Sequence, residues 1–153
     1  MSHDASLDLL KELGEFSQLF DISPSIHILD INYCCDDITN TLNSLVNPYD
    51  GKITTLNTTN SNELRIKVKK SNYDYIVLSS SFLNQEDKNL FMKIASLGLR
   101  DSGYIIFLET KDKPLDEIYD ILEEFDYGAV SCIDIFKDYN LVMGKKLHMW
   151  GMD

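Results

Sequence analysis

The chain has 153 residues, 44% of them hydrophobic, and a formal net charge of −11 at pH 7. This length is enough for a single domain with a sizeable core, and the acidic balance argues against the basic surface on which nucleic-acid binding depends. No apolar run is long enough to span a membrane and no signal peptide is recognisable, so we expect a cytoplasmic protein with neither nucleic-acid nor membrane partners.

The first element that the sequence predicts is an amphipathic helix over residues 6–20, covering the sheet that follows. Ser6 suits its N-cap position. The apolar residues at helical spacing behind this cap are Leu9, Leu10, Leu13 and Phe16. Pro24 then separates the helix from the first strand.

Residues 25–42 predict a strand, a loop and a helix. The apolar run 26–29 ends in Asp30, small and polar residues follow, and a helical pattern opens at Asp36 or Asp37. This is the first unit of a doubly wound α/β sheet, in which ligands bind at the carboxyl ends of the strands.

The same stretch resembles motif I of the class I S-adenosylmethionine-dependent methyltransferases, whose usual form is Leu-Asp-x-Gly-x-Gly-x-Gly-x-x-Thr-x-x-Leu. The positions that match this motif are Leu29, Asp30, Thr39 and Leu42. The positions of its three glycines hold Asn32, Cys34 and Asp36. The resemblance implies that this loop faces a cofactor.

The missing glycines bear on whether a cofactor still binds. Glycine allows a positive φ and lets the backbone approach a ligand closely, and of the three replacements Asn32 tolerates the left-handed region best. Cys34 and Asp36 place side chains where the cofactor would approach, and the charge of Asp36 repels the cofactor carboxylate. The loop is therefore either a well-capped turn without a ligand or an unusual cofactor loop.

The next elements are a strand at residues 52–56 and a helix at 61–70. In the resembling family an acid at the end of this strand binds the ribose hydroxyls. Asn57 takes that place here, and an amide lacks the charge-assisted hydrogen bonds of a carboxylate.

Residues 73–78 predict a central strand that resembles motif IV of the family, and Ser79 ends it at a position from which the family draws substrate contacts. At roughly 30 residues for each βαβ unit, the segment 25–78 has room for three strands. The family core needs four strands there. We therefore expect one βα unit to be missing from the half that cradles adenosine.

The second half of the chain is closer to the family pattern. Asn84 is expected to cap a helix that runs to about residue 97. Residues 99–109 resemble the family's Leu-x-Pro-Gly-Gly-x-Leu-x-x-x-Glu stretch and predict a turn into another central strand.

Pro114 suits the first turn of the following helix, which Gly128 is expected to end. Residues 129–136 and 139–147 then predict an antiparallel hairpin with a short turn at 137–138. Methyltransferase-like sheets end in such a hairpin.

Cys34 and Cys35 lie where a doubly wound sheet would bind its ligand. A thiol at a helix N-terminus can have a lowered pKa, but no Cys-x-x-Cys spacing or neighbouring histidine supports a metal or redox site. We therefore expect no metal, no disulfide framework and no chemistry at this pair.

The predicted architecture is an α/β, Rossmann-like doubly wound, mostly parallel sheet with helices on both faces and a C-terminal antiparallel hairpin. One methyltransferase-like domain is expected over residues 1–153. Its parts are an N-terminal helical segment at 1–24, an α/β core at 25–147 and a tail at 148–153.

Two functions fit these residues. The first is a non-catalytic binding or assembly module that has lost S-adenosylmethionine binding, has no cofactor, and acts on a protein partner or a second copy of the chain. The alternative is a small active methyltransferase of unknown substrate that uses S-adenosylmethionine. Its candidate cofactor contacts are Asp30, Asn32, Cys34, Asp36, Asn57 and Ser79.

The two functions predict different surroundings for the loop. A large apolar-lined pocket beside Asp30 would favour the enzyme, and a crevice filled by the side chain of Cys34 or Tyr33 would favour the module.

Overall fold

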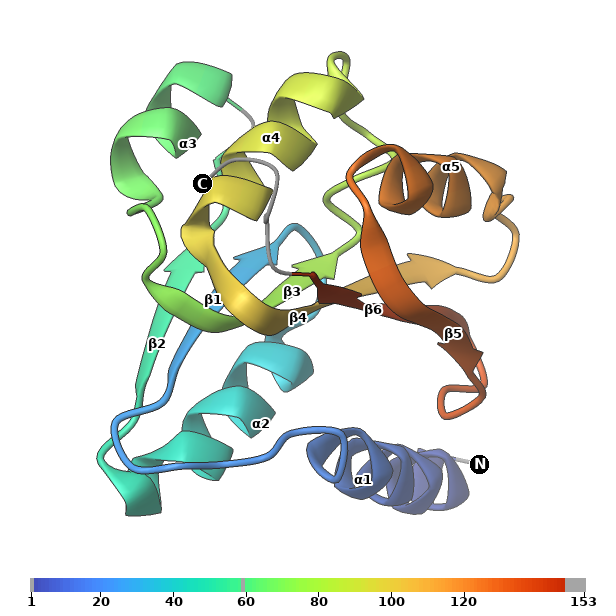
Figure 1. The fold of residues 1–153 in the computed structure, drawn as a ribbon. Coiled ribbons are helices and arrows are strands. Elements are labelled where there is room, and N and C mark those ends of the chain that lie inside the picture. The colour runs from blue at the N-terminus through green and yellow to red at the C-terminus, as the bar shows by residue number, and fades with distance from the viewer. Residues whose placement is uncertain (1, 59, 148–153) are drawn as a thin grey trace.

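The computed structural model describes residues 2–58 and 60–147, and its described part holds one sheet of six strands in the order β2-β1-β3-β4-β6-β5 (Figure 1). The strands are β1 His27–Asn32, β2 Lys52–Leu56, β3 Tyr73–Ser79, β4 Leu99–Thr110, β5 Tyr127–Ile133 and β6 Tyr139–Lys146. The helices are α1 Ser2–Ser17, α2 Asp36–Val46, α3 Ser61–Lys67, α4 Lys88–Gly98 and α5 Asp116–Glu124, with a 3-10 turn at Asn47–Tyr49. The tail predicted at 148–153 lies outside the described residues.

Strands β1 to β4 form a parallel sheet, and β6 pairs antiparallel with both β4 and β5. The predicted fold class is therefore confirmed, including the antiparallel hairpin. Because β2 and β3 lie on opposite sides of β1, the loops that follow β1 and β3 leave the sheet at the point where the strand order reverses. Ligands bind at such a point in open α/β sheets.

The sheet is covered on both faces. Figure 1 shows α1 and α2 below it and α3, α4 and α5 above it. Successive side chains of a strand point to opposite faces, and accordingly Ile28 packs on the α1/α2 side and Leu29 on the other. Helix residues buried on the α1/α2 side include Phe16, Ile38, Leu42 and Val46. Those buried on the other side include Leu64, Phe91, Ile118 and Leu122.

Residues 25–78 contain three strands, as the spacing of the sequence predicted. Strand β2 is the edge of the sheet and pairs with β1 alone among the described residues. No helix in the described ranges is long and apolar enough to cross a membrane.

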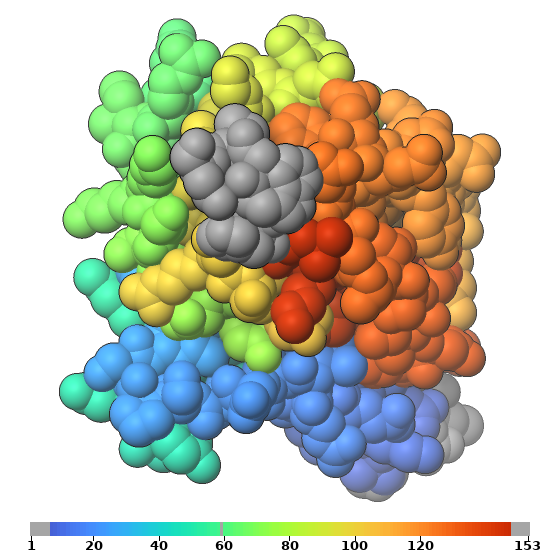
Figure 2. Space-filling view, in the orientation of Figure 1, coloured from blue at the N-terminus to red at the C-terminus, as the bar shows by residue number. Residues whose placement is uncertain are grey.

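In Figure 2 the blue N-terminal segment runs along the lower part of the molecule. A hollow of about 530 Å³ lies where this segment meets the starts of β4 and β5. Arg100 lines it and forms an ion pair with Asp74, 2.9 Å between Nη1 and Oδ1.

Several predicted boundaries were wrong. Helix α1 begins at Ser2, so Ser6 lies inside the helix and is not its cap. Helix α4 begins at Lys88, and its cap is Asp87, whose Oδ1 accepts a hydrogen bond from Leu90 N at 3.0 Å. Asn84 instead donates from Nδ2 to Ser80 O at 2.9 Å and holds the loop that follows β3.

Other differences lie at helix ends. Helix α3 stops at Lys67, short of the predicted residue 70. Pro114 precedes the cap residue of α5 and lies outside its first turn. That helix ends at Glu124 with Phe125 as its C-cap, and the chain turns at Asp126 with φ of 59°, so Gly128 lies within β5 and does not end the helix. An aspartate can adopt this left-handed conformation, which makes the glycine unnecessary there.

Candidate functional site

The carboxyl ends of β1, β2 and β3 place several polar side chains at one edge of the sheet. The parallel pairing sets Asp30 beside Thr55 of β2 and Asn32 beside Ser79 of β3. Asp30 and Ser79 have no exposed surface, and Asn32 is 9% exposed. Three of the predicted site residues therefore lie close together and are buried.

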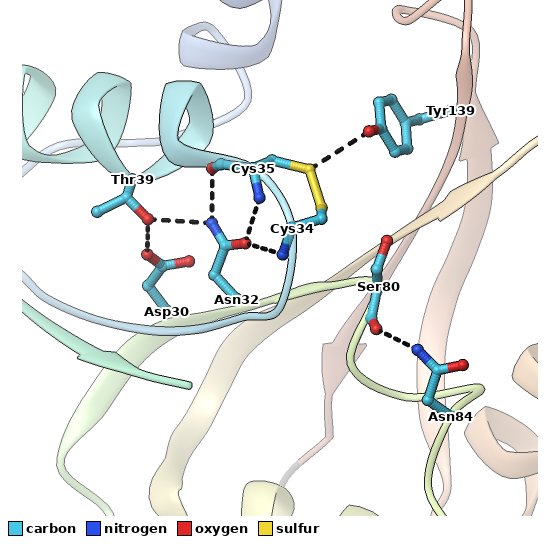
Figure 3. The surroundings of a disulfide bond; sticks show 8 residues. All are labelled: Asp30, Asn32, Cys34, Cys35, Thr39, Ser80, Asn84 and Tyr139. Carbon is cyan, nitrogen blue, oxygen red and sulfur yellow. Dashed lines mark hydrogen bonds between the residues drawn. A yellow bond between two sulfur atoms is a disulfide. The ribbon is translucent and has the colours of Figure 1, made fainter. Parts of the chain in front are cut away.

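The side chain of Asn32 organises the loop between β1 and α2 (Figure 3). Its Oδ1 accepts hydrogen bonds from Cys34 N at 2.9 Å and from Cys35 N at 2.7 Å. Its Nδ2 donates to Cys35 O at 2.7 Å and to Thr39 Oγ1 at 3.0 Å. An asparagine has two donors and an acceptor with two lone pairs, so this side chain is fully used. Two backbone N–H groups of the loop are consequently bonded within the loop.

Asp30 lies behind this loop. Its Oδ2 accepts hydrogen bonds from Thr39 Oγ1 at 2.5 Å and from Thr55 Oγ1 at 3.3 Å. Its Oδ1 is buried and has no hydrogen-bond partner among the described residues. Burial raises the pKa of Asp30 above the usual range, and the two threonine hydroxyls counteract only part of that effect.

The side chain of Tyr33 crosses the carboxyl edge of the sheet. Its hydroxyl donates to Thr58 O at 2.7 Å and accepts from Gln85 Nε2 at 3.0 Å. Gln85 Nε2 also donates to Ser81 O at 2.7 Å. The Tyr33 ring packs against the hydrophobic cluster on the α3/α4 side of the sheet. One side chain thus connects the segments that follow β1, β2 and β3.

Glu109, near the end of β4, is a further buried carboxyl group, 3% exposed. Its Oε2 accepts a hydrogen bond from Leu83 N at 3.2 Å, in the loop that follows β3. Burial raises the pKa of Glu109, and the hydrogen bonds from the backbone of Leu83 and Phe82 lower it by less. Neither Glu109 nor Gln85 was among the predicted site residues. Glu109 is the last residue of the 99–109 stretch that resembles a family motif, whereas Gln85 lies in the loop between β3 and α4 and no local pattern marks it.

The structure joins Cys34 and Cys35 by a disulfide bond. No disulfide was predicted from the sequence, because three cysteines, two of them adjacent, make no disulfide framework. Cys34 is exposed and Cys35 is half-buried, with its Sγ 3.4 Å from the Tyr139 hydroxyl of β6 (Figure 3).

A hollow of about 550 Å³ lies on the β2 side of the loop. Its lining residues are Asn32, Tyr33, Cys34, Cys35, Asp36, Thr39, Thr55 and Asn57. Four predicted contacts, Asn32, Cys34, Asp36 and Asn57, therefore surround one space. Asp30 and Ser79 do not line it.

A second hollow, of about 490 Å³, lies on the other side of the disulfide, under α1 and beside the β5–β6 hairpin. Four of its lining residues carry carboxylates: Glu12, Asp36, Asp37 and Asp138. The disulfide lines both hollows.

The buried carboxyl groups of Asp30 and Glu109 predict a pH dependence. A carboxyl group whose pKa is raised by folding stabilises the protein most below its unfolded pKa, and this contribution is lost as the pH rises through the folded pKa. We expect the unfolding free energy of the wild type to fall relative to the Asp30→Asn/Glu109→Gln variant between about pH 4 and pH 7. Urea denaturation at both pH values measures this difference. If the unfolding free energy of the wild type rose relative to that of the variant at the higher pH, the raised pKa values of Asp30 and Glu109 would be contradicted.

No family model and no curated protein sequence matches the chain, whereas many solved structures match it. A SAM-dependent methyltransferase from Aquifex aeolicus superposes with a TM-score of 0.70 at 14% identity, covering 88% of this chain and 89% of that one. A SAM-dependent methyltransferase from Archaeoglobus fulgidus has a TM-score of 0.66 at 11% identity, covering 91% and 94%. The chain has the class I methyltransferase-like fold.

A larger enzyme of this fold has been solved with its ligands. Phosphoethanolamine N-methyltransferase 2 from Haemonchus contortus, in complex with phosphomonomethylethanolamine and S-adenosylhomocysteine, has a TM-score of 0.65 at 8% identity. The methyltransferase-like chain described here spans 52% of that protein. Identities this low establish the fold.

Proposed function

We propose that this methyltransferase-like chain does not bind S-adenosylmethionine and serves as a non-catalytic binding or assembly module for a protein partner. The observation that carries the proposal is the position of the Tyr33 side chain. It is bonded to Thr58 and Gln85 across the carboxyl ends of β1, β2 and β3, where a doubly wound sheet binds its ligand.

The hydrogen bonds of the loop support the same proposal. Backbone N–H groups before a helix N-terminus bind anionic ligands when they are free to point at them. Here Asn32 Oδ1 accepts from the N–H groups of Cys34 and Cys35. The carboxylates of Asp36 and Asp37 in the first turn of α2 add a negative field. These residues do not fit the carboxylate end of S-adenosylmethionine.

The edge of the sheet offers a surface for a protein partner. Lys52 N donates to Ile26 O at 2.8 Å, toward β1. Because successive residues of a strand direct their N–H groups to opposite sides, those of Ile53 and Thr55 face the outer edge of β2. An extended segment of a partner can pair with such an edge.

The hollow of about 550 Å³ favours a second candidate, a small active methyltransferase. Its volume is within the range of small-molecule sites, and it reaches Asn57 at the end of β2. In this alternative, Asn57 would hold the ribose hydroxyls that an acid holds in the resembling family.

Calorimetric titration with S-adenosylmethionine and S-adenosylhomocysteine separates the two candidates. We expect no binding heat up to about 1 mM ligand. The reason is that Asn32 already accepts from the loop amides and that Tyr33 lies across the carboxyl ends of the strands. Asn57→Ala is the matched variant, because Asn57 is exposed and lines the hollow. Micromolar binding to the wild type that Asn57→Ala weakens would overturn the proposal and favour the alternative.

A further inference from the structure

We propose that the Cys34–Cys35 disulfide is a reversible thiol–disulfide site, reduced by a dithiol that attacks Sγ of Cys34. The bond lies at the tip of the loop between β1 and α2 and lines a hollow on each side. This inference is independent of whether S-adenosylmethionine binds.

Exposure distinguishes the two sulfur atoms. Cys34 is exposed, whereas Cys35 is half-buried and lies against Tyr139. A thiolate attacks a disulfide along the axis of the S–S bond and needs access to the sulfur that it attacks. The accessible target is therefore Sγ of Cys34, and the leaving sulfur is Sγ of Cys35.

The surroundings of Cys35 suit a leaving thiolate. Cys35 is the N-cap residue of α2, a helix of 11 residues, and the positive end of a helix stabilises a thiolate there. A disulfide sulfur carries no hydrogen, so in the 3.4 Å contact the Tyr139 hydroxyl is the donor to Cys35 Sγ. The carboxylates of Asp36 and Asp37 in the first turn of α2 weaken the stabilising effect of the helix dipole. The Tyr139 hydroxyl is then the group that directly favours negative charge on Cys35 Sγ.

The reaction is a two-electron exchange. The first thiolate of the dithiol forms a mixed disulfide with Cys34, and the electron pair of the Cys34–Cys35 bond passes to Cys35 Sγ, which takes up a proton. The second thiol of the dithiol then attacks the reductant's own sulfur in the mixed disulfide and releases Cys34 as a thiol. The dithiol leaves as a disulfide, having given two electrons and two protons to the protein.

Contacts that do not involve sulfur also hold the loop. The hydrogen bonds of the Asn32 side chain involve backbone groups of Cys34 and Cys35 and the hydroxyl of Thr39, and none involves sulfur. These hydrogen bonds are available to the loop in both oxidation states.

Negative charge around the site selects among reductants. Asp36 and Asp37 follow the disulfide directly, and Glu12 and Asp138 line the hollow beside it. Such a field slows the approach of a thiolate more strongly the more negative charge the reductant carries. At equal thiolate concentration, we expect the thiolate of 2-mercaptoethanol, which has a single negative charge, to react about tenfold faster than the more negatively charged thiolate of glutathione.

Maleimide labelling with intact-mass measurement tests the proposal on the folded chain. Protein purified in air is expected to take one label, on the exposed free Cys132, and to take three after dithiothreitol. The Cys132→Ser variant should take no label before reduction and two labels after it. Three labels before reduction, or a pair that dithiothreitol does not reduce without denaturant, would overturn the proposal.

Two further measurements test the roles of the sulfur atoms. Peptide mapping of the mixed disulfide trapped with glutathione should place the adduct on Cys34, and an adduct on Cys35 would overturn the assignment. Tyr139→Phe should slow reduction severalfold while leaving the circular dichroism spectrum unchanged. An unchanged rate in this variant would rule out the hydroxyl as the group that favours the leaving thiolate.

Discussion

The Asn32→Ala variant is expected to lose about 3 kcal/mol of unfolding free energy, because one buried side chain makes four hydrogen bonds that alanine cannot make. Each bond contributes about 1 kcal/mol net, and the N–H groups of Cys34 and Cys35 lose their acceptor. Urea denaturation followed by circular dichroism measures the loss.

Asn43→Ala is the matched control for this prediction. Asn43 lies on α2 and makes one exposed side-chain hydrogen bond, from Nδ2 to Thr39 O at 3.0 Å. Its replacement should change the unfolding free energy by no more than about 0.5 kcal/mol. Equal losses in the two variants would show that Asn32 does not hold the loop together.

The Phe82→Ala variant is expected to lose about 3–5 kcal/mol, the usual range for deleting a buried phenylalanine ring. Phe82 has no exposed surface, and its ring contacts Phe107 edge-on with 5.2 Å between centroids and Phe91 with 6.3 Å. It lies in the loop between β3 and α4, so it anchors the segment that carries Gln85 toward Tyr33. The same denaturation experiment measures this loss.

Two further substitutions are controls for the loss of unfolding free energy in Phe82→Ala. Phe82→Leu keeps most of the apolar volume and should lose less than Phe82→Ala. Leu97→Ala removes a side chain that is 49% exposed on α4 and should lie within about 0.5 kcal/mol of the wild type. A loss below about 1 kcal/mol in Phe82→Ala would mean that the loop is held by other contacts.

The fold was predictable because long apolar strands and amphipathic helices carry strong patterns. The apolar run 73–78 predicted a strand, and the spacing of Ile38 and Leu42 predicted a helix. The structure confirms both, as β3 and α2. Helix ends were less predictable, because several polar residues in a row can each serve as a cap. Asn84 and Asp87 both precede α4, and tertiary packing decides that Asp87 is the cap.

Less of the candidate site was predictable. The motif resemblance located the loop, and the structure places Asn32, Cys34, Asp36 and Asn57 around one hollow. What each side chain bonds to depends on its rotamer and on segments distant in sequence. The bond from Gln85 to the Tyr33 hydroxyl spans 52 residues of chain, and no local pattern predicts it.

The place of β6 in the sheet has a consequence for the growing chain on the ribosome. This last strand lies between β4 and β5, so β5 can join the sheet only after β6 has been synthesised. Until then the β4 edge remains unpaired and is available to other chains, the usual risk of an incomplete sheet. A chain that ends before Tyr139 therefore lacks β6 and has an unpaired β4 edge, even though most of the domain has been synthesised.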